Sequence, residues 1–424
     1  MKQTCYKKLG ETITHAVLSN GLHIYIDVKP QYGKQFAFFA ANYGGMHMRF
    51  REQGTPWEET PAGVAHFLEH KMFDTEDGNA LQRLAANGVD PNAFTASSMT
   101  GYYFEGTDGF DENLKTLLSF VSIPYFTPES VAKEQGIIGQ EIRMGEDNPD
   151  IEVFYNLLKG LYRHHPIRTN IAGTVESIAE ITADTLYSCH HAFYNPGNMV
   201  LCVAGNVVPS KIVALAEQVL PTNALPVVET DFGPVEEMSA YRSHVECHMS
   251  VSAPLFQVGF KGMPPAKGSY LRQRLLGGLI SDVLAGPSSP LYTRLYGKGL
   301  INGSFGGGYE SEPQCAFLAF GGESKQPELV RDEIMEEAAR VAQEGIDTQL
   351  WERQKKAAYG SMIRQLNSLE NICIEVAQAH FDGEEFLAFP SLFQSLSKEE
   401  AETLISSWCV PERMTLSIVW PKEV

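Results

Sequence analysis

Residues 181–203 read ITADTLYSCHHAFYNPGNMVLCV, and residues 396–418 read LSKEEAETLISSWCVPERMTLSI. In both stretches an amphipathic helical pattern is followed by a proline and then by a short apolar run, which is typical of a buried strand. Four positions correspond at one constant offset: Phe193 with Trp408, Pro196 with Pro411, Met199 with Met414, and Leu201 with Leu416. We interpret this correspondence as the duplication of one fold.

A second pair of stretches supports the duplication. FTPESVAKEQGIIGQE at 126–141 resembles IDTQLWERQKKAAYGS at 346–361, and a chain of 424 residues is long enough for two domains. Residues 221–240, PTNALPVVETDFGPVEEMSA, are rich in proline and acidic residues and lack a helical period, which is typical of a linker. The sequence therefore predicts an N-terminal domain at 1–220, a linker at 221–245 and a homologous domain at 246–424.

Strand and helix patterns alternate along the first half of the chain. Residues 18–28, which contain an Asn-Gly turn, and residues 34–45 and 199–207 are expected to form strands. Helices are expected at 62–73, 79–87, 111–122 and 128–144. The predicted fold class is α+β, with two homologous α/β-sandwich domains in which helices pack on an antiparallel sheet.

Composition narrows the function classes. Lys and Arg number 33 against 52 Asp and Glu, and the formal net charge of −19 argues against nucleic acid or an anionic membrane as partner. The seven cysteines are scattered without a C-x-x-C pair, so neither a disulfide framework nor a thiolate zinc cluster is expected. The N-terminal residues lack the apolar run of a secretory signal, and no stretch is long and apolar enough to span a membrane. We expect a cytoplasmic protein.

The stretch GVAHFLEHKMF at 63–73 carries the strongest chemical signal. His66 and His70 are four residues apart, so in a helix both imidazoles project from one face and can bind one Zn²⁺. Glu69 lies at the edge of the same face, where it can act on water without being a ligand. This is the H-x-x-E-H pattern of the inverzincins.

A third protein ligand is needed if the fourth position is to stay open. Glu134 and Glu141 are candidates because seven residues place them about two turns apart on one helix face. Ile137 and Ile138 between them are expected on the buried side. For such a pair of glutamates taken alone, ordinary surface charge is the competing interpretation.

With these residues the whole chain resembles the insulinase, pitrilysin and mitochondrial processing peptidase family of zinc peptidases. In that family H-x-x-E-H is followed some seventy residues later by a glutamate ligand in an E-x6-E helix, and His70 and Glu141 are 71 residues apart here. The resemblance implies His66, His70 and Glu141 as ligands of one Zn²⁺ per chain. It also implies Glu69 as general base and Glu134 as a supporting catalytic carboxylate.

The resemblance further implies how substrate is held. The segment NAFTA at 92–96 matches the family strand that pairs with an extended peptide, so Asn92, Ala93 and Phe94 are predicted to bind substrate. The family works as a clam-shaped chamber of four homologous domains. A chain with two domains is one half of such a chamber, so a dimer is implied.

One stretch departs from the family pattern. Many relatives carry an Arg and a Tyr that contact substrate in a segment of the form LREKRGLAYS, whereas residues 288–309 here read SSPLYTRLYGKGLINGSFGGGY. Tyr296 takes the place of the arginine and Ile301-Asn302 that of the alanine-tyrosine. Arg294 and Tyr309, both displaced along the chain, are the candidate replacements. We therefore hypothesise a heterodimer in which a homologous subunit supplies the missing pair.

The second domain is expected to be catalytically silent, since Gln354 and Ser361 stand opposite the two glutamates and no H-x-x-E-H recurs. The leading hypothesis is a zinc metalloendopeptidase that hydrolyses short or unfolded peptides. The main alternative is a non-catalytic core or scaffold subunit of a peptidase-like heterodimer. A different zinc hydrolase, such as an amidase, is a third interpretation.

Overall fold

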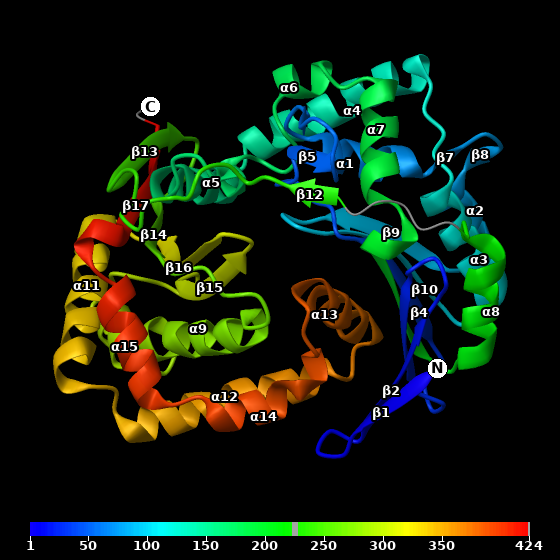
Figure 1. Ribbon diagram of the computed structural model, residues 1–424. Helices are drawn as coiled ribbons and strands as arrows, with labels where there is room; N and C mark the ends of the chain where they lie inside the picture. The colour runs from blue at the N-terminus through cyan, green and yellow to red at the C-terminus, as the bar shows by residue number, and fades with distance from the viewer. Residues whose placement is uncertain (223–227, 423–424) are drawn as a thin grey trace. The chain divides into compact units, whose positions relative to one another are not determined.

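The computed structural model describes residues 1–222 and 228–422, which form two units, each built around one β-sheet (Figure 1). Unit 1 comprises residues 1–142, 170–232 and 363–388, and unit 2 comprises residues 143–169, 233–362 and 389–424. Neither unit is one continuous stretch of chain. The predicted domains at 1–220 and 246–424 describe the two duplicated halves of the sequence and remain a prediction. The packed units differ from these halves because each contains a segment of the other half.

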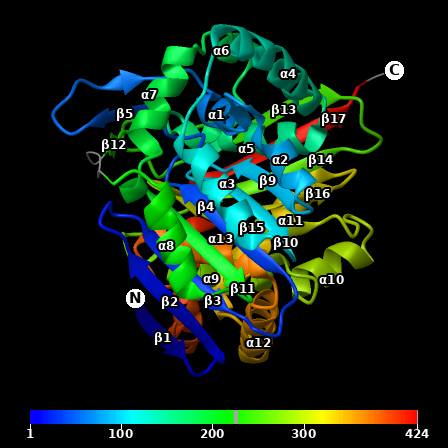
Figure 2. The same ribbon diagram turned by 90° about the vertical axis from the view of Figure 1, so that its right-hand side faces the viewer.

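The sheet of unit 1 has the strand order β1-β2-β3-β11-β4-β10-β9, and these strands lie side by side in Figure 2. Its strands are β1 (Lys2–Tyr6), β2 (Glu11–Val17), β3 (His23–Val28), β4 (Gln35–Ala41), β9 (Asp90–Thr95), β10 (Thr100–Gly106) and β11 (Met199–Gly205). Short strands β5 (Arg49–Glu52), β6 (Glu58–Glu59), β7 (Asp74–Thr75), β8 (Gly78–Asn79) and β12 (Val228–Thr230) form two smaller sheets.

The helices of unit 1 pack on this sheet or beside the helices that do. They are α1 (Val64–Met72), α2 (Ala80–Ala86), α3 (Phe110–Ser122), α4 (Pro128–Glu146), α6 (Val175–Ala179), α7 (Ala183–Phe193), α8 (Pro209–Val219) and α13 (Leu369–Asp382). Each helix predicted in the first half is present within a few residues of its expected bounds. Thr127 accepts a hydrogen bond from the backbone N–H of Ser130 at 3.2 Å, which satisfies one of the unpaired donors at the start of α4.

The sheet of unit 2 repeats the plan of unit 1. Its strands are β13 (His244–Met249), β14 (Leu255–Lys261), β15 (Gly306–Glu312), β16 (Cys315–Glu323) and β17 (Met414–Pro421), in the order β13-β17-β14-β16-β15. This is the order β3-β11-β4-β10-β9 with each strand replaced by its counterpart in the second half. Helices α7 and α15 (Lys398–Trp408) begin 215 residues apart, as do β11 and β17. The duplication and the predicted α+β class are confirmed.

The remaining helices of unit 2 are α5 (Pro149–Leu161), α9 (Tyr270–Ala285), α10 (Pro290–Gly297), α11 (Pro327–Glu344), α12 (Thr348–Gln365) and α14 (Phe389–Ser395). Short 3-10 turns are present at Pro166–Arg168, Pro196–Asn198, Phe386–Ala388 and Pro411–Arg413.

Both sheets differ from the prediction in one pair of strands. Strand β11 runs parallel to β3 and antiparallel to β4, and β17 runs parallel to β13 and antiparallel to β14. The last strand of each half returns after a long helical stretch, which lets it insert between β3 and β4 in unit 1 and between β13 and β14 in unit 2. Each sheet is therefore mixed rather than wholly antiparallel.

The two halves exchange one helix each. Helix α5, from the first half, packs on β17 and β14 of unit 2, and α13, from the second half, packs on β11 and β4 of unit 1. Contact with the sheet is close at Gly160, where a Cβ would lie 2.3 Å from the Thr415 side chain. Ser417 also donates a hydrogen bond to the carbonyl of Val153 at 2.8 Å. These non-local contacts explain why the units do not follow the sequence halves.

Part of the predicted linker is structured. Residues 223–227 lie outside the described residues, but Val228–Thr230 form strand β12, which pairs with β5. Glu229 of β12 binds Arg51 of β5 through an ion pair of 2.6 Å, and Asp231 binds Arg49. Two of the acidic residues in the predicted linker, Glu229 and Asp231, thus have basic partners on a neighbouring strand.

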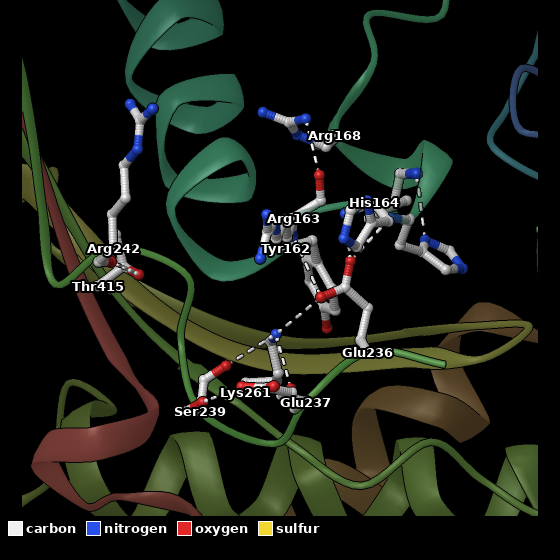
Figure 3. A network of polar contacts seen from close by, with 12 residues as sticks. Tyr162, Arg163, His164, Arg168, Glu236, Glu237, Ser239, Arg242, Lys261 and Thr415 are labelled. Atoms are coloured by element: carbon white, nitrogen blue, oxygen red, sulfur yellow. Dashed lines mark hydrogen bonds and ion pairs between the residues drawn. The ribbon is translucent and has the colours of Figure 1, made fainter. Parts of the chain in front are cut away.

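In unit 2 the chain after this segment is held by a buried lysine (Figure 3). Lys261 of β14 is 2% exposed, and its ammonium donates to the backbone carbonyls of Glu237 and Ser239 at 3.0 Å and approaches Glu236 at 3.4 Å. Burial acts to raise the pKa of Glu236, but backbone N–H donors of residues 163–165 and the Lys261 charge outweigh it and hold the pKa below its usual value. Lys261 and Glu236 are both partnered in this network, which offsets the cost of burying their charges.

A histidine cluster fastens α13 to the sheet of unit 1. His15 Nε2 lies 3.0 Å from His23 Nδ1, the His23 ring centroid lies 4.5 Å from that of His380 on α13, and the Tyr25 hydroxyl lies 3.2 Å from His380 Nδ1. Burial, with the charges of His23 and His15, lowers the pKa of His380 to about 4. Burial also lowers the pKa of His15 and of His23. All three imidazoles are therefore neutral in the fold near pH 7.

This cluster makes the stability of unit 1 depend on pH. His380 has a folded pKa below its unfolded value of about 6.5, so the unfolded chain binds more protons between these pH values and stability is lost as pH falls through that window. We expect the opening free energy of α13 to drop between pH 7 and pH 5 by about 2 kcal/mol more in the wild type than in His380→Gln.

Amide hydrogen exchange of α13 at the two pH values measures this difference. His191→Gln serves as the control because the His191 side chain is 63% exposed. An equal pH dependence in wild type and His380→Gln would contradict the prediction.

Among the residues that the structure describes, none of the helices combines the length and the apolar character that a bilayer crossing requires.

Candidate metal centre

Helix α1 carries both histidines of the H-x-x-E-H stretch on a buried scaffold. Val64, Phe67, Leu68 and Met72 are each at most 2% exposed and join the core beneath the helix. With its apolar side fixed in this way, the helix presents His66 and His70 together, and their ring centroids lie 4.7 Å apart.

Close backbone contact determines where α1 begins. Gly63, directly before the helix, has φ 96°, and a Cβ there would lie 2.6 Å from the carbonyl oxygen of Ala172. Gly173 has φ 76°, and its Cβ would lie 2.5 Å from the carbonyl oxygen of Ala62. A side chain at either position would push the two segments apart, and both backbones adopt a conformation that glycine tolerates best.

Helix α4 brings the two glutamates to the histidines. Val131, Ile138 and Ile142 are each at most 5% exposed and pack into the core of unit 1. Ile137, in contrast, is 47% exposed, so its predicted burial is wrong. Ile137 directly precedes the buried Ile138, and a helix turns by about 100° per residue, so its side chain points away from the core. Glu134 and Glu141 both project toward α1.

Three side chains place donor atoms around one point. One ring nitrogen each from His66 and His70 and a carboxylate oxygen of Glu141 all lie within 4.8 Å of one another. Glu141 approaches His66 Nε2 at 3.5 Å and His70 Nε2 at 3.7 Å. Ligands about 2.1 Å from a tetrahedral ion are about 3.4 Å apart, so two imidazoles and one carboxylate at these separations fit Zn²⁺.

Glu134 settles the orientation of one imidazole. Its Oε1 lies 3.0 Å from His70 Nδ1, so this ring can donate its proton to the carboxylate and keep the Nε2 lone pair free. His66 Nδ1 is buried and has no hydrogen-bond partner among the described residues. Among the described residues, a hydrogen bond therefore orients the His70 ring, whereas none orients the His66 ring through Nδ1.

The negative charges dominate the electrostatics of the site. Burial acts to lower the pKa of His70, but the hydrogen bond to Glu134 and the charges of Glu69, Glu134 and Glu141 raise it overall. The hydrogen bond with His66, and the charges of both imidazoles, hold the pKa of Glu141 below its usual value despite partial burial. A site that favours positive charge to this extent is suited to a divalent cation.

Glu69 lies beside this group and has a partner that the sequence analysis missed. Glu69 as a residue is 8% exposed, and its Oε2 accepts a hydrogen bond of 2.6 Å from the hydroxyl of Thr95. Thr95 is the last residue of β9 and follows the predicted substrate residues directly. The alternation of side chains along a strand predicts from the sequence that Thr95 and Ala93 lie on the same face of the sheet. It does not predict that α1 packs against β9, because that contact joins distant parts of the chain.

The predicted substrate strand is at the edge of the sheet. Strand β9 pairs with β10 on one side, and among residues 1–222 and 228–422 no strand pairs with its other side. Asn92 is exposed, and its side chain accepts a hydrogen bond from the N–H of Ala93 at 2.9 Å. Phe94 points to the opposite face from Thr95 and stacks on Phe38, with ring centroids 5.8 Å apart.

The two candidate replacements for the Arg/Tyr pair lie in unit 2, where each has structural partners. Arg294 of α10 binds Glu333 at 2.9 Å and Glu337 at 3.4 Å, both on α11. Tyr309 of β15 accepts a hydrogen bond from Gln273 at 2.7 Å and stacks on Trp408. Their role in substrate binding stays a prediction.

The second half lacks the ligand set. Gln354, the counterpart of Glu134, is buried and donates to the carbonyl of Asp282 at 3.0 Å and to Ser288 at 3.2 Å. Among the residues that the structure describes, His66, His70 and Glu141 form the only group of three or more such ligands.

Sequence profiles of known families match most of the chain. Residues 57–175 match the profile described as Insulinase (Peptidase family M16), and residues 180–358 match the one described as Peptidase M16 inactive domain. The uncharacterized zinc protease YmfH of Bacillus subtilis (strain 168) is 35% identical over 424 residues, which cover 98% of each chain.

Solved structures show the same fold. The crystal structure of an M16-like peptidase from Alicyclobacillus acidocaldarius is 32% identical and superposes with a TM-score of 0.93 over 98% of this chain and 99% of the other. The periplasmic protease PqqL from Escherichia coli is 16% identical and superposes with a TM-score of 0.75, and all of this chain corresponds to 48% of that protein.

The contact between Glu134 and His70 predicts a measurable effect on metal affinity. We expect Glu134→Gln to weaken zinc binding by about 10- to 100-fold, because the partner that orients His70 and raises its basicity is lost. Competition with a chromophoric chelator measures the affinity. Glu129→Gln on the same helix, at an exposed position, is the control. Equal zinc affinity of Glu134→Gln and wild type would refute this contribution.

Proposed function

The chain belongs to the insulinase family, peptidase family M16, and on this basis we propose that it is a zinc-dependent metalloendopeptidase that hydrolyses short or unfolded peptides. The observation that carries the proposal is the convergence of His66, His70 and Glu141, with Glu69 on the same helix as the histidines and close enough for its charge to act on His70. The relative YmfH, which matches over 98% of this chain, is named a zinc protease, which supports the same metal.

In this proposal His66, His70 and Glu141 hold one Zn²⁺ per chain. The ion, when bound, lowers the pKa of a coordinated water toward about 7 and polarises the scissile carbonyl. One carboxylate and two neutral imidazoles leave the ion with net positive charge. Glu134 holds the His70 ring through Nδ1 so that Nε2 faces the site.

Glu69 is the proposed general base. Its Oε2 is occupied by the Thr95 hydroxyl, which leaves Oε1 to accept a proton from the attacking water and to deliver it to the leaving amine. General base catalysis of this kind contributes about 10²- to 10⁴-fold to the rate.

Strand β9 is the proposed substrate-binding strand, with Asn92, Ala93 and Phe94 as contact residues. Its unpaired edge offers backbone N–H and C=O groups to an extended peptide, and such pairing tolerates many side chains. This preference for extended chains explains why short or unfolded peptides are the expected substrates.

We also propose that the working form is a dimer in the cytoplasm. The chain corresponds to 48% of PqqL, which supports a chamber that requires two chains of this length. Tyr296 and Asn302 stand where many relatives have Arg and Tyr, so a homologous partner subunit is proposed to supply that pair. Arg294 and Tyr309 remain the candidates for a replacement within this chain.

Substitution of the general base tests the proposed chemistry. We expect Glu69→Gln to retain one zinc per chain and to lose at least about 100-fold in kcat on a fluorogenic peptide, because glutamine cannot accept the proton. Glu76→Gln, at an exposed position shortly after α1, is the control. Near-normal turnover by Glu69→Gln would remove Glu69 from this role. A zinc-loaded wild type that cleaves no peptide would favour the scaffold alternative.

Restoring the missing pair tests the heterodimer. If the partner normally supplies Arg and Tyr, the double variant Tyr296→Arg, Asn302→Tyr of this chain alone should gain about tenfold in kcat/KM, equivalent to about 1.4 kcal/mol of transition-state binding. The matched control is Tyr292→Arg with Asn302→Tyr, since Tyr292 lies one turn earlier on α10. Efficient hydrolysis by the purified wild-type chain, with no gain in the double variant, would contradict the heterodimer.

A further inference from the structure

We propose that Thr95 is a positioning residue that holds the Glu69 carboxylate in its reactive orientation and couples that orientation to the strand that binds the peptide. This inference rests on the proposed function and adds to it a residue outside the ligand set and outside the predicted substrate contacts. The observation behind it is the 2.6 Å hydrogen bond from the Thr95 hydroxyl to Glu69 Oε2.

The hydrogen bond distinguishes the two oxygens of the carboxylate. In the described part of the chain, no donor other than Thr95 hydrogen-bonds to the Glu69 side chain. With Oε2 fixed, rotation about the last side-chain bond is restricted and Oε1 remains available for proton transfer. Glutamate otherwise populates a broad range of this torsion, so the restraint removes orientations in which the base faces away from the site.

The donor itself is held firmly. Threonine is branched at Cβ, which restricts its first side-chain torsion, and Thr95 is in register with Thr100 of β10. The Thr100 hydroxyl in turn donates to the carbonyl of Tyr43 at 2.7 Å, and Thr100 is fully buried. A rigid strand therefore supplies the hydroxyl, and a buried helix supplies the carboxylate.

The backbone of Thr95 faces the unpaired edge of the sheet. Ala96 donates its N–H inward to the carbonyl of Met99 at 2.7 Å. Because inward and outward pairing alternate along an antiparallel strand, the backbone groups of Thr95 and Ala93 point outward. Thr95 is therefore placed to bind the peptide backbone through its own backbone while its side chain binds the base. One residue thus sets the distance between the bound peptide and Glu69.

Two variants separate the hydroxyl from the shape of the side chain. Thr95→Val keeps the branched shape and removes the donor, whereas Thr95→Ser keeps the donor. Thr14→Val, on β2, is the control for the loss of a buried threonine hydroxyl from the same sheet. Each full-length protein is loaded with zinc, its zinc content is measured, and kcat and KM are determined on one fluorogenic peptide.

We expect Thr95→Val to lose about 10- to 100-fold in kcat, the size of effect that follows from a misplacement of about 1 Å, with KM within about twofold. Thr95→Ser and Thr14→Val should stay within about threefold of wild type, and all variants should bind one zinc per chain. A kcat of Thr95→Val equal to that of wild type would overturn the proposal. So would a loss in Thr95→Ser as large as in Thr95→Val, since that result would point to packing rather than to the hydrogen bond.

A crystallographic readout keeps this inference separate from the proposed function. In zinc-loaded crystals the Glu69 side chain should adopt one orientation in the wild type and more than one in Thr95→Val. If wild type cleaves no peptide but this difference is present, the positioning role stands and the peptidase proposal fails. If Glu69 keeps its single orientation in Thr95→Val, the positioning role is refuted whatever the activity.

Discussion

The burial of helix α1 is the constraint on which the rest of the site depends. Phe67 and Leu68 are completely buried, so the helix cannot rotate without exposing them. His66 and His70 must then face α4, and three polar side chains on a mainly buried helix need partners to offset their desolvation. Glu134, Glu141 and Thr95 provide those partners. The same packing that stabilises unit 1 thus preorganises the donor set.

The duplicated halves differ at the candidate metal centre, and among the described residues only the first half carries the ligand set. Both halves contain the same five-stranded order and a helix in the position of α4, but the second half has Gln354 where the first has Glu134. The buried Gln354 amide donates to the backbone carbonyl of Asp282 and to the Ser288 hydroxyl, so its hydrogen bonds are satisfied without a metal. The exchange of α5 and α13 means that each sheet is completed by a helix from the other half of the sequence. Neither half therefore has all of its core without the other.

In the proposed function, strand β9 links peptide binding to the proposed general base Glu69. Among the described residues no strand pairs with its outer edge, β10 pairs with its inner edge, and the Thr95 side chain hydrogen-bonds to Glu69, which belongs to the same helix as the candidate ligands His66 and His70. A strand can serve both purposes because its backbone groups lie in the plane of the sheet while its side chains project above and below it. If a peptide pairs with β9 as proposed, its position and the orientation of Glu69 depend on the same short segment.

The amino-acid sequence by itself determined the local features: the helical face shared by His66 and His70, the matching face of α4, and the repeated helix–strand unit. These follow from periodicities of 3.6 and 2 residues, which need no knowledge of distant contacts. Only the tertiary structure showed the hydrogen bond between Thr95 and Glu69 and the exposure of Ile137. It also showed the ion pair between Glu229 and Arg51, and the packing of α5 and α13 on the sheet of the opposite half. The physical reason is that such contacts join residues far apart in the chain, and many weak packing interactions together select them.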